Sequence, residues 1–269
     1  MMRPQINDWN DLAFAFEDVN PESNAFQHTS FGMLDDNDIL HYGQLNIPKA
    51  EISLDQLAAA LEPVHDDAVF PAWPLPGTDL RKAPGALPAN VHIKRPSLEL
   101  YPMLKQLGID VKQLFDTIIA EAQVLEELSQ HPHPNLIRYH GCRIVRGHFT
   151  GLVLDRHPHD LQTYVQHGHG SLDKTHFTAA LESAIKHLHD LGWAHNDLSP
   201  GNLLVSEEGM PVLIDFGGCQ KFGTKLKYIR GTKEWIEGEI EAYTTSEAQH
   251  DIFALGKVQA WLEDSGSLE

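Results

Sequence analysis

Three side chains near residue 200 have the types and the spacing that phosphoryl transfer requires. Asp197 and Asn202 lie in one segment between an apolar helical stretch and an apolar run, and Asp215 ends the next apolar run, 13 residues after Asn202. Loops at strand ends often carry catalytic residues, so these side chains can converge on one point. A carboxylate and an amide oxygen suit Mg²⁺, and a second carboxylate can orient or deprotonate a hydroxyl group. The pattern therefore predicts a site for phosphoryl transfer.

Apolar residues at three- and four-residue spacing predict the helices of the chain. Ser53 and Gln56 form a capping box, which satisfies the first amides of a helix, and Gly192 fits a helix C-cap. The helices are expected over residues 54–62, 113–128 and 177–191.

Short apolar and β-branched runs predict the strands. Arg146-Gly147 separates one pair of runs and Glu207-Glu208-Gly209 separates another, which indicates two antiparallel hairpins. The strands are expected over residues 91–94, 136–145, 148–154, 203–205 and 212–214.

The composition is that of a folded, acidic protein. The 269 residues are 42% hydrophobic and 22% charged, which excludes a disordered or fibrous chain. The formal net charge of -18 leaves no basic stripe for a nucleic acid, so none is expected as a partner. No apolar run approaches the length of a membrane span and the start is polar, so we expect a cytoplasmic or nuclear protein without membrane contact. Cys142 and Cys219 are expected to be free thiols.

The first third of the chain differs from the rest. Residues 1–80 contain 14 of the 38 acidic side chains but 2 of the 20 Lys and Arg side chains. Residues 21–47 mix Pro, Asn, Ser, Asp and Gly without a lasting period, which predicts a loop or a loosely attached tail. Five prolines between residues 71 and 88 predict a linker or irregular turns.

An ordered set of short motifs runs through the remaining sequence. VHIK ends at Lys94, Glu121 lies in AEAQVLEEL, HND-x4-N runs from His195 to Asn202, and DFG begins at Asp215. This set resembles the eukaryotic protein kinase family over about residues 91–262. It looks most like a group of small fungal kinase-like proteins with an HND loop.

The resemblance implies a fold and a division of the chain. It implies an α+β, two-lobed protein kinase-like fold, with a degenerate small lobe and a C-terminally truncated, mainly helical large lobe. The expected parts are an acidic N-terminal extension with a short helix over 1–75, the small lobe over 76–155 and the large lobe over 156–269. Asp251 would open a buried helix of the large lobe, and Gly231-Thr232 would belong to the end of an activation segment.

The resemblance also implies the roles of the catalytic residues. Lys94 would hold the α- and β-phosphates of ATP and pair with Glu121. Asp215 and Asn202 would ligate Mg²⁺, and Asp197 would accept or orient the substrate hydroxyl. The expected cofactors are ATP and Mg²⁺, and the expected partner is a protein substrate with a hydroxyl group.

Further residues would bind adenine or link the lobes. By the same resemblance Leu154 would be the gatekeeper, and the backbone from Asp155 to His157 would meet adenine. A stack linking the lobes would consist of Leu125, Tyr139, His195 and Phe216.

The chain departs from the family pattern at several points. No GxGxxG precedes Lys94, the Arg of HRD is Asn196, and the Lys two residues after the catalytic Asp is Ser199. No APE is present between Gly217 and Asp251. Without that Arg, activity should not depend on a phosphorylated activation loop. Two alternatives to a protein serine/threonine kinase stay open: a pseudokinase that acts as a nucleotide-binding or scaffolding module, and a kinase for a small molecule.

Twelve of the 17 histidines lie between His131 and His195, which suggests a metal site. These histidines stand mostly in turns beside Pro and Gly, and no Cys or Glu completes a ligand set at zinc spacing. A structural zinc is therefore not expected.

Overall fold

The computed structural model describes residues 4–20, 22–226 and 230–265 and divides into two compact units. The first unit comprises Met1–Thr78, Arg95–Asp116 and Arg143–Gly151, and the second comprises Asp79–Lys94, Thr117–Cys142 and Leu152–Glu269. The units interleave along the chain, so the predicted lobe boundaries near residues 75 and 155 stay predictions.

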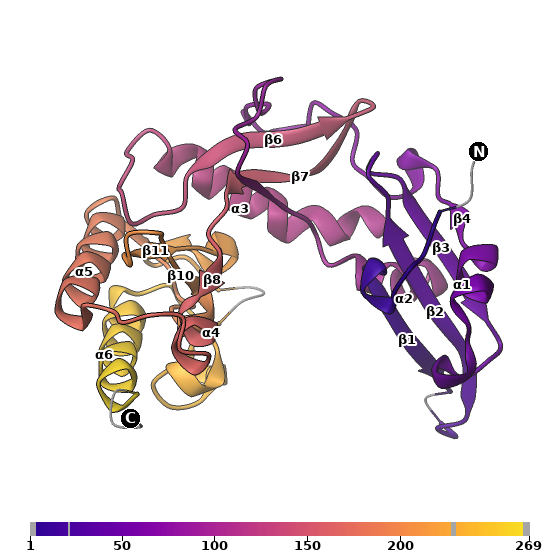
Figure 1. Cartoon of the computed structure of the whole chain (residues 1–269). Helices are drawn as coiled ribbons and strands as arrows, with labels where there is room; N and C mark the ends of the chain where they lie inside the picture. The colour runs from indigo at the N-terminus through magenta and orange to yellow at the C-terminus, as the bar shows by residue number, and fades with distance from the viewer. Residues whose placement is uncertain (1–3, 21, 227–229, 266–269) are drawn as a thin grey trace. The chain divides into compact units, whose positions relative to one another are not determined.

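An antiparallel sheet of four strands, in the order β1-β2-β3-β4, forms the basis of the first unit (Figure 1). Helix α1 follows the third strand, and helix α2 belongs to the second stretch of this unit. The bounds are β1 (Phe14–Val19), β2 (Phe26–Leu34), β3 (Leu40–Leu45), α1 (Leu54–Ala60), β4 (Glu62–Pro63) and α2 (Tyr101–Gln106).

The prediction of a loop or tail over residues 21–47 is wrong, because most of this stretch forms strands β2 and β3 of the sheet. The middle of β2 buries Thr29 and Ser30, whose hydroxyls donate to the carbonyl of Ile47 at 2.7 Å and to Asp18 Oδ2 at 2.6 Å. Because these hydrogen bonds satisfy polar side chains inside the sheet, the strand lacks the apolar alternation on which strand prediction depends.

Helix α1 begins at the predicted capping box. Ser53 Oγ accepts a hydrogen bond from the Gln56 amide at 3.3 Å, and Gln56 Oε1 accepts one from the Ser53 amide at 2.9 Å. Leu57 and Leu61 pack with Phe31 of β2 in the core of this unit. The prediction of a helix over 54–62 is confirmed, with its end two residues earlier.

The second unit contains a three-stranded sheet in the order β5-β7-β6, a second three-stranded sheet in the order β11-β10-β8, and the pair β12-β9. Strands β6 and β7 extend into the first unit at their shared turn. The strand bounds are β5 (Val91–Lys94), β6 (Tyr139–Val145), β7 (His148–Asp155), β8 (His159–Asp160), β9 (Trp193–Ala194), β10 (Leu203–Val205), β11 (Pro211–Leu213) and β12 (Gln220–Lys221).

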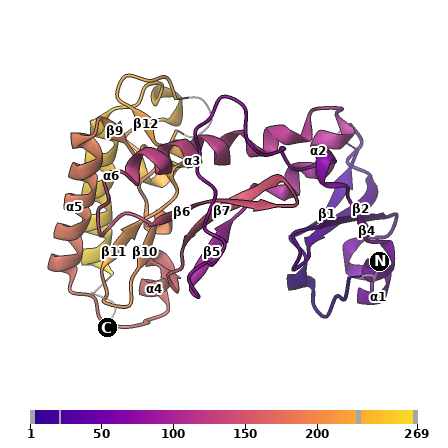
Figure 2. The ribbon, with the colours of Figure 1, turned by 90° about the horizontal axis from the view of Figure 1, so that it is seen from above.

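The helices of the second unit follow the predicted pattern. Helices α5 and α6 lie side by side, and α3 runs along the β5-β7-β6 sheet (Figures 1 and 2). Arg146 and Gly147, both with positive φ, make the predicted turn between β6 and β7. The bounds are α3 (Asp116–Leu128), α4 (Leu161–Gln166), α5 (Lys174–Asp190) and α6 (Ala248–Asp264).

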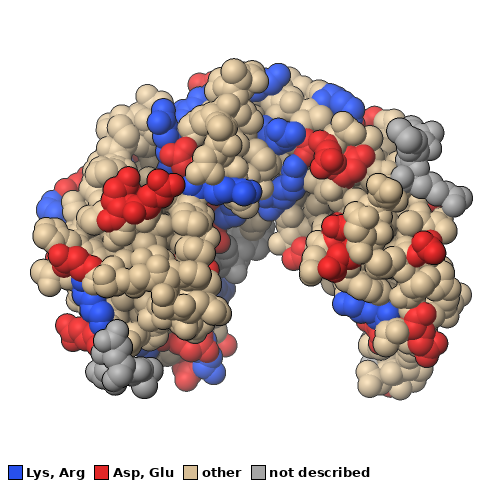
Figure 3. All heavy atoms as spheres, viewed as in Figure 1, with Lys and Arg blue, Asp and Glu red and all other residues tan. Residues whose placement is uncertain are grey.

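Three features of the described residues concern possible partners: the distribution of surface charge, the composition of the helices and the grouping of possible metal ligands. On the face drawn in Figure 3, acidic and basic side chains are interspersed. None of the helices in the described ranges has both the length and the apolar composition needed to cross a bilayer. Within the same ranges, no three His, Cys, Asp or Glu side chains form a group able to hold a metal ion by themselves.

Buried Asp38 is expected to be a main source of stability in the first unit. Its carboxylate pairs with Arg95 and with Arg143, whose Nε lies 2.8 Å from Oδ2. Asp38→Asn keeps the shape but leaves two partly buried guanidinium groups without their counter-charge, so we expect a loss of about 3–5 kcal/mol in the free energy of unfolding. Urea titration measures this loss. Exposed Asp36, in the same turn, provides the matched control Asp36→Asn, and equal effects of the two changes would contradict the prediction.

Candidate functional site

Lys94 is the centre of a charged cluster in the second unit. Its Nζ lies 2.8 Å from the carboxylate of Glu121 and 2.8 Å from Oδ1 of Asp215. The predicted ion pair between Lys94 and Glu121 is therefore present. Burial alone would lower the pKa of Lys94, but attraction by the two carboxylates outweighs it, so the pKa is raised. Lys94 is thus held in its charged form.

Helix α3 delivers Glu121 to this cluster. The helix buries Ile118, Ala122 and Leu125, and the side chain of Glu121 is 3% exposed. Glu121 Oε1 also accepts a hydrogen bond from the Phe216 amide at 3.2 Å. Burial raises the pKa of Glu121, and Lys94 opposes that shift. One carboxylate therefore joins the strand that carries Lys94 to the turn that follows Asp215.

A tight turn after β11 presents Asp215. The residue has a φ of 62°, in the left-handed region, and its Oδ1 accepts a hydrogen bond from the Gly217 amide at 3.4 Å. Burial would raise the pKa of Asp215, but the attraction of Lys94 outweighs this effect and the pKa is lowered. Asp215 is therefore ionised at neutral pH.

Asp197 and Asn202 lie together in the segment between β9 and β10. Asn202 Nδ2 donates to the carbonyl of Asp197 at 2.7 Å and to its Oδ2 at 3.1 Å. Thr232 Oγ1 donates to Asp197 Oδ1 at 2.8 Å. Burial raises the pKa of Asp197, while the hydrogen bond from Thr232 opposes the shift.

The donor set fits Mg²⁺. The nitrogen of the Asn202 amide is engaged with Asp197, so the amide oxygen can serve as a ligand, as can the carboxylate of Asp215. Mg²⁺ in phosphate-transfer sites takes one or two protein carboxylates and completes its shell with phosphates and waters. Two protein ligands with only oxygen donors are therefore sufficient.

Asp251 fixes the backbone of this segment. Its fully buried carboxylate accepts hydrogen bonds from the amides of His195 and Asn196, both at 2.8 Å, and contacts His189 Nε2 at 2.9 Å. Asp251 lies in the first turn of α6, which begins at Ala248, three residues before the start that the resemblance implied. The rigid helix therefore anchors the two residues directly before Asp197.

Asn196 takes a role that sequence reasoning missed. Its Nδ2 donates to the carbonyls of Ala194 and Gly218 and to Ser246 Oγ, each at 3.0 Å. His250 Nδ1 donates to its Oδ1 at 3.1 Å. These bonds join both ends of the segment from 218 to 246 to the loop of Asp197. The sequence shows the loss of an arginine at this position, but nothing in it pairs Asn196 with Ser246.

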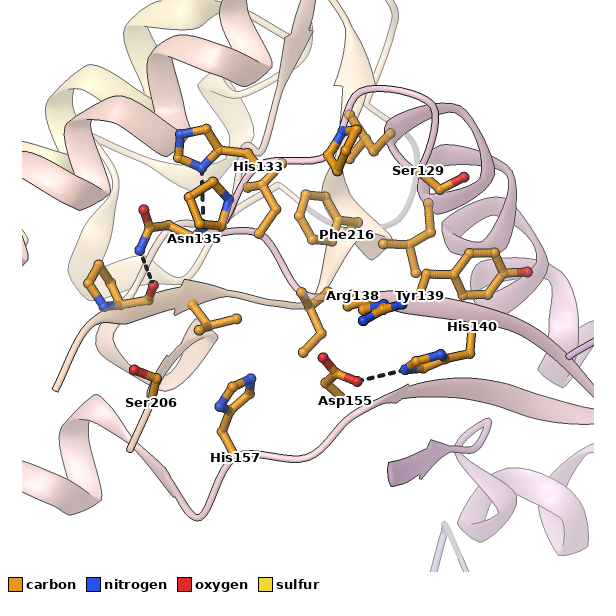
Figure 4. A pocket seen from close by; sticks show the side chains of 18 of the residues that line it. Ser129, His133, Asn135, Arg138, Tyr139, His140, Asp155, His157, Ser206 and Phe216 are labelled. Atoms are coloured by element: carbon orange, nitrogen blue, oxygen red, sulfur yellow. Dashed lines mark hydrogen bonds and ion pairs between the residues drawn. The ribbon is translucent and has the colours of Figure 1, made fainter. Parts of the chain in front are cut away.

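Two of the residues predicted at the adenine site line a cavity in the second unit. Asp155 and His157 line a cavity of about 1100 Å³ with Arg138, where Asp155 Oδ1 also contacts His140 Nε2 at 2.6 Å (Figure 4). Of the described residues that line it, none belongs to the charged cluster. Leu154 is buried and does not line it.

The predicted stack between the lobes is present in part. The rings of His195 and Phe216 meet edge to face with centroids 5.4 Å apart, and His195 Nε2 donates to the carbonyl of Ile214. Leu125, Tyr139 and Phe216 line the same cavity.

Comparison with known proteins identifies the family. The protein kinase domain family matches residues 103–262, which is more than half of the chain. The chain belongs to this family. The predicted α+β, kinase-like fold is thereby confirmed, whereas the likeness to fungal proteins with an HND loop is untested. The match begins after Lys94, so the assignment of this lysine depends on the geometry of its ion pairs.

Several serine/threonine kinases are similar to this kinase-domain protein. It is 30% identical over 174 residues to the serine/threonine-protein kinase/endoribonuclease IRE2 of Homo sapiens, covering 58% of this chain and 18% of the relative. It is 27% identical over 157 residues to the serine/threonine-protein kinase TAO3 of Xenopus laevis, covering 57% and 16%. The chain spans less than a fifth of the length of either relative. The crystal structure of the yeast RNA Pol II CTD kinase CTDK-1 complex matches with 20% identity and a TM-score of 0.49, covering 55% of this chain and 50% of that one.

Asn196→Ala is expected to loosen the segment that follows Asp215. The change removes three donated hydrogen bonds and places Ala at a φ of 64°, so we expect a loss of about 2–4 kcal/mol in the free energy of unfolding. Hydrogen exchange should become faster at the amides of residues 219–226. Ser199→Ala, at a buried neighbour in the same loop, is the control, and unchanged exchange in Asn196→Ala would contradict the role of Asn196.

Proposed function

We propose that this protein is an ATP- and Mg²⁺-dependent phosphotransferase, most simply a protein serine/threonine kinase that moves the γ-phosphoryl group to a hydroxyl. The carrying observation is the cluster in which Lys94 contacts both Glu121 and Asp215 at 2.8 Å. These residues come from a strand, a helix and a turn far apart in sequence. Similarity to curated serine/threonine kinases supports the same reading.

The proposed work of the chain is positioning and charge stabilisation. Lys94 would bind the α- and β-phosphates while Glu121 keeps its ammonium in place. Asn202 and Asp215 would hold Mg²⁺, which supplies positive charge to the phosphate oxygens when bound. The backbone from Asp155 to His157, which follows the proposed gatekeeper Leu154 in the sequence, would bind adenine.

Asp197 is the proposed partner of the acceptor hydroxyl. Asp197 is partly exposed, and Thr232 Oγ1 donates to its Oδ1 at 2.8 Å, so a hydroxyl group of the chain reaches this carboxylate. A substrate hydroxyl that donates to the same carboxylate would be oriented for attack and could transfer its proton there. This geometry supports an alcohol as acceptor and does not discriminate a protein side chain from a small molecule.

One observation favours a pseudokinase as the second candidate. Residues 79–90, directly before β5, contain no helix or strand, and no glycine-rich hairpin precedes Lys94. Backbone amides over the phosphates would then be missing, and affinity for ATP would depend on Lys94 and the metal ligands.

A place among small fungal kinase-like proteins with an HND loop is also part of the proposal, on the strength of His195–Asn202 alone.

Thermal unfolding with ATP tests the nucleotide site. Saturation at 100 times the dissociation constant stabilises a protein by about 2.7 kcal/mol, so ATP with Mg²⁺ should raise the unfolding temperature by several degrees. Asp215→Asn should lose the dependence on Mg²⁺. Glu208→Gln, at an exposed acidic residue, is the control that should keep it. No shift for the wild-type protein at millimolar ATP would contradict the proposal and favour a pseudokinase that does not bind nucleotide.

Turnover distinguishes the enzyme from a pseudokinase that binds ATP. Asp197→Asn should abolish phosphoryl transfer, measured with labelled ATP and a mixture of peptides and small alcohols, and should leave the thermal shift by ATP in place. A wild-type protein that binds ATP but transfers nothing to either class of acceptor would be a pseudokinase.

The pH dependence of turnover should report on Asp197. Its carboxylate must be ionised to accept a proton, and burial raises its pKa above 3.8, so turnover should be lost as the pH falls through this raised value. Thr232→Val removes a hydrogen bond that stabilises the ionised form, and the acidic limb of kcat/KM should move to higher pH. Thr244→Val, at an exposed threonine of the same segment, should leave the limb in place. A limb that moves to lower pH in Thr232→Val would contradict the assignment.

A further inference from the structure

The proline-rich segment before β5 is held against the edge of strand β6. Arg81 O accepts a hydrogen bond from the Cys142 amide at 2.8 Å, and the Ala83 amide donates to Cys142 O at 2.9 Å. Gly141 has a φ of 127°, and a Cβ at this position would lie 2.6 Å from Ala83 N. Only glycine permits so close an approach of two backbones. Two hydrogen bonds to Cys142 and the close approach of Gly141 therefore hold the backbone of residues 81–83 against β6.

The side chain of Arg81 connects this segment to helix α3 and to strand β6. Its Nη1 donates to Glu126 Oε1 and to Ser129 Oγ, both at 2.7 Å, at the end of the helix. Its Nη2 donates to the carbonyl of Tyr139 at 2.8 Å, at the start of the strand. The guanidinium also lies 4.8 Å from the centroid of the Tyr139 ring. One planar group thus bonds the helix and the strand together.

These two elements determine where the members of the central ion pair lie. Glu121 is five residues before Glu126 in the same helix, about 7.5 Å along its axis. Lys94 ends β5, which pairs with β7, the neighbour of β6. Because a helix and a paired sheet move as rigid elements, a bond between α3 and β6 also fixes the distance from Glu121 to Lys94.

We propose that Arg81 is a positioning residue for this ion pair: its guanidinium clamps helix α3 to β6 and so keeps Glu121 on Lys94. The proposal deepens the phosphotransferase function and, for its importance to turnover, rests on that function. Arginine suits the role because its planar fork donates in several fixed directions, whereas a lysine ammonium is a point charge on a flexible stem.

The test measures the reactivity of the Lys94 amine in protein without nucleotide, so its result does not depend on turnover. Trace labelling of amines with acetic anhydride across a pH series, read by mass spectrometry of the peptide that contains Lys94, gives the midpoint at which this amine becomes reactive. In Arg81→Gln, Glu121 should contact Lys94 for a smaller fraction of the time. The ammonium is then less stabilised, so the midpoint should move to lower pH. Each unit of displacement raises labelling below the midpoint about tenfold. Arg81→Lys should move the midpoint in the same direction, since it cannot make all three bonds.

Matched changes on helix α3 separate the clamp from general loosening. Glu126→Gln removes the carboxylate that Arg81 contacts and should reproduce the displacement of Arg81→Gln, with no further displacement in the double variant. The adjacent Glu127 pairs instead with Lys221 at 2.5 Å, and Glu127→Gln should leave the midpoint of Lys94 where it is. An unchanged midpoint in Arg81→Gln, or an equal displacement in Glu127→Gln, would overturn the proposal.

Failure of the clamp and failure of the proposed function give different results. If wild-type protein shows no Mg²⁺-dependent thermal shift by ATP while the midpoint still moves in Arg81→Gln, the clamp stands and the nucleotide function fails. If the thermal shift is present and the midpoint does not move, the function stands and the clamp is wrong. If both hold, Arg81→Gln should also weaken the affinity for ATP with Mg²⁺.

Discussion

The position of the Lys94 ammonium between two carboxylates is the constraint on which the second unit depends. A buried charge is stable only beside a counter-charge, and Glu121, whose side chain is 3% exposed, has this counter-charge in Lys94. The counter-charges of Lys94 come from Glu121 in helix α3 and from Asp215 after β11. Glu121 also accepts the amide of Phe216. Strand, helix and turn are therefore coupled, because a shift of any one of them would separate opposite charges, of which that of Glu121 is buried.

The loop of Asp197 is held by hydrogen bonds rather than by ion pairs. Asn196 stands in this loop where the HRD motif of protein kinases has an arginine. Asp251 accepts two backbone amides of this loop, and the neutral amide of Asn196 ties it to Gly218 and Ser246. These hydrogen bonds are buried, so water does not compete for them. Two positions of the segment between Asp215 and α6, Gly218 and Ser246, are thus bonded to the loop by an uncharged side chain.

The resemblance to protein kinases predicts the charged cluster well, because each of its members lies in a short motif that resembles one of that family. Lys94, Glu121 and Asp215 were assigned from VHIK, the apolar helix and DFG, and the structure brings them together. The sheet of the first unit was missed because its strands bury hydroxyls and glycines, which erase the apolar alternation. The contacts of Asn196 and Arg81 were missed for another reason. Their partners lie at distances along the chain that no local period encodes, and only the folded backbone pairs them.

The charge balance of the cluster bears on whether the site has retained a ligand. Lys94 neutralises one carboxylate, while Glu121, Asp215 and Asp197 contribute three, and the repulsion of Asp215 is among the influences that raise the pKa of Asp197. An ion pair of this kind adds little to stability, because well-packed apolar residues of similar volume are often as stabilising or more so. Stability therefore does not account for such a cluster. The carboxyl groups outnumber the one ammonium among these residues, and the oxygen donors of Asp215 and Asn202 are of the kind that Mg²⁺ prefers. A charged cluster of this kind is typical of a functional site, which is consistent with the proposed phosphotransferase.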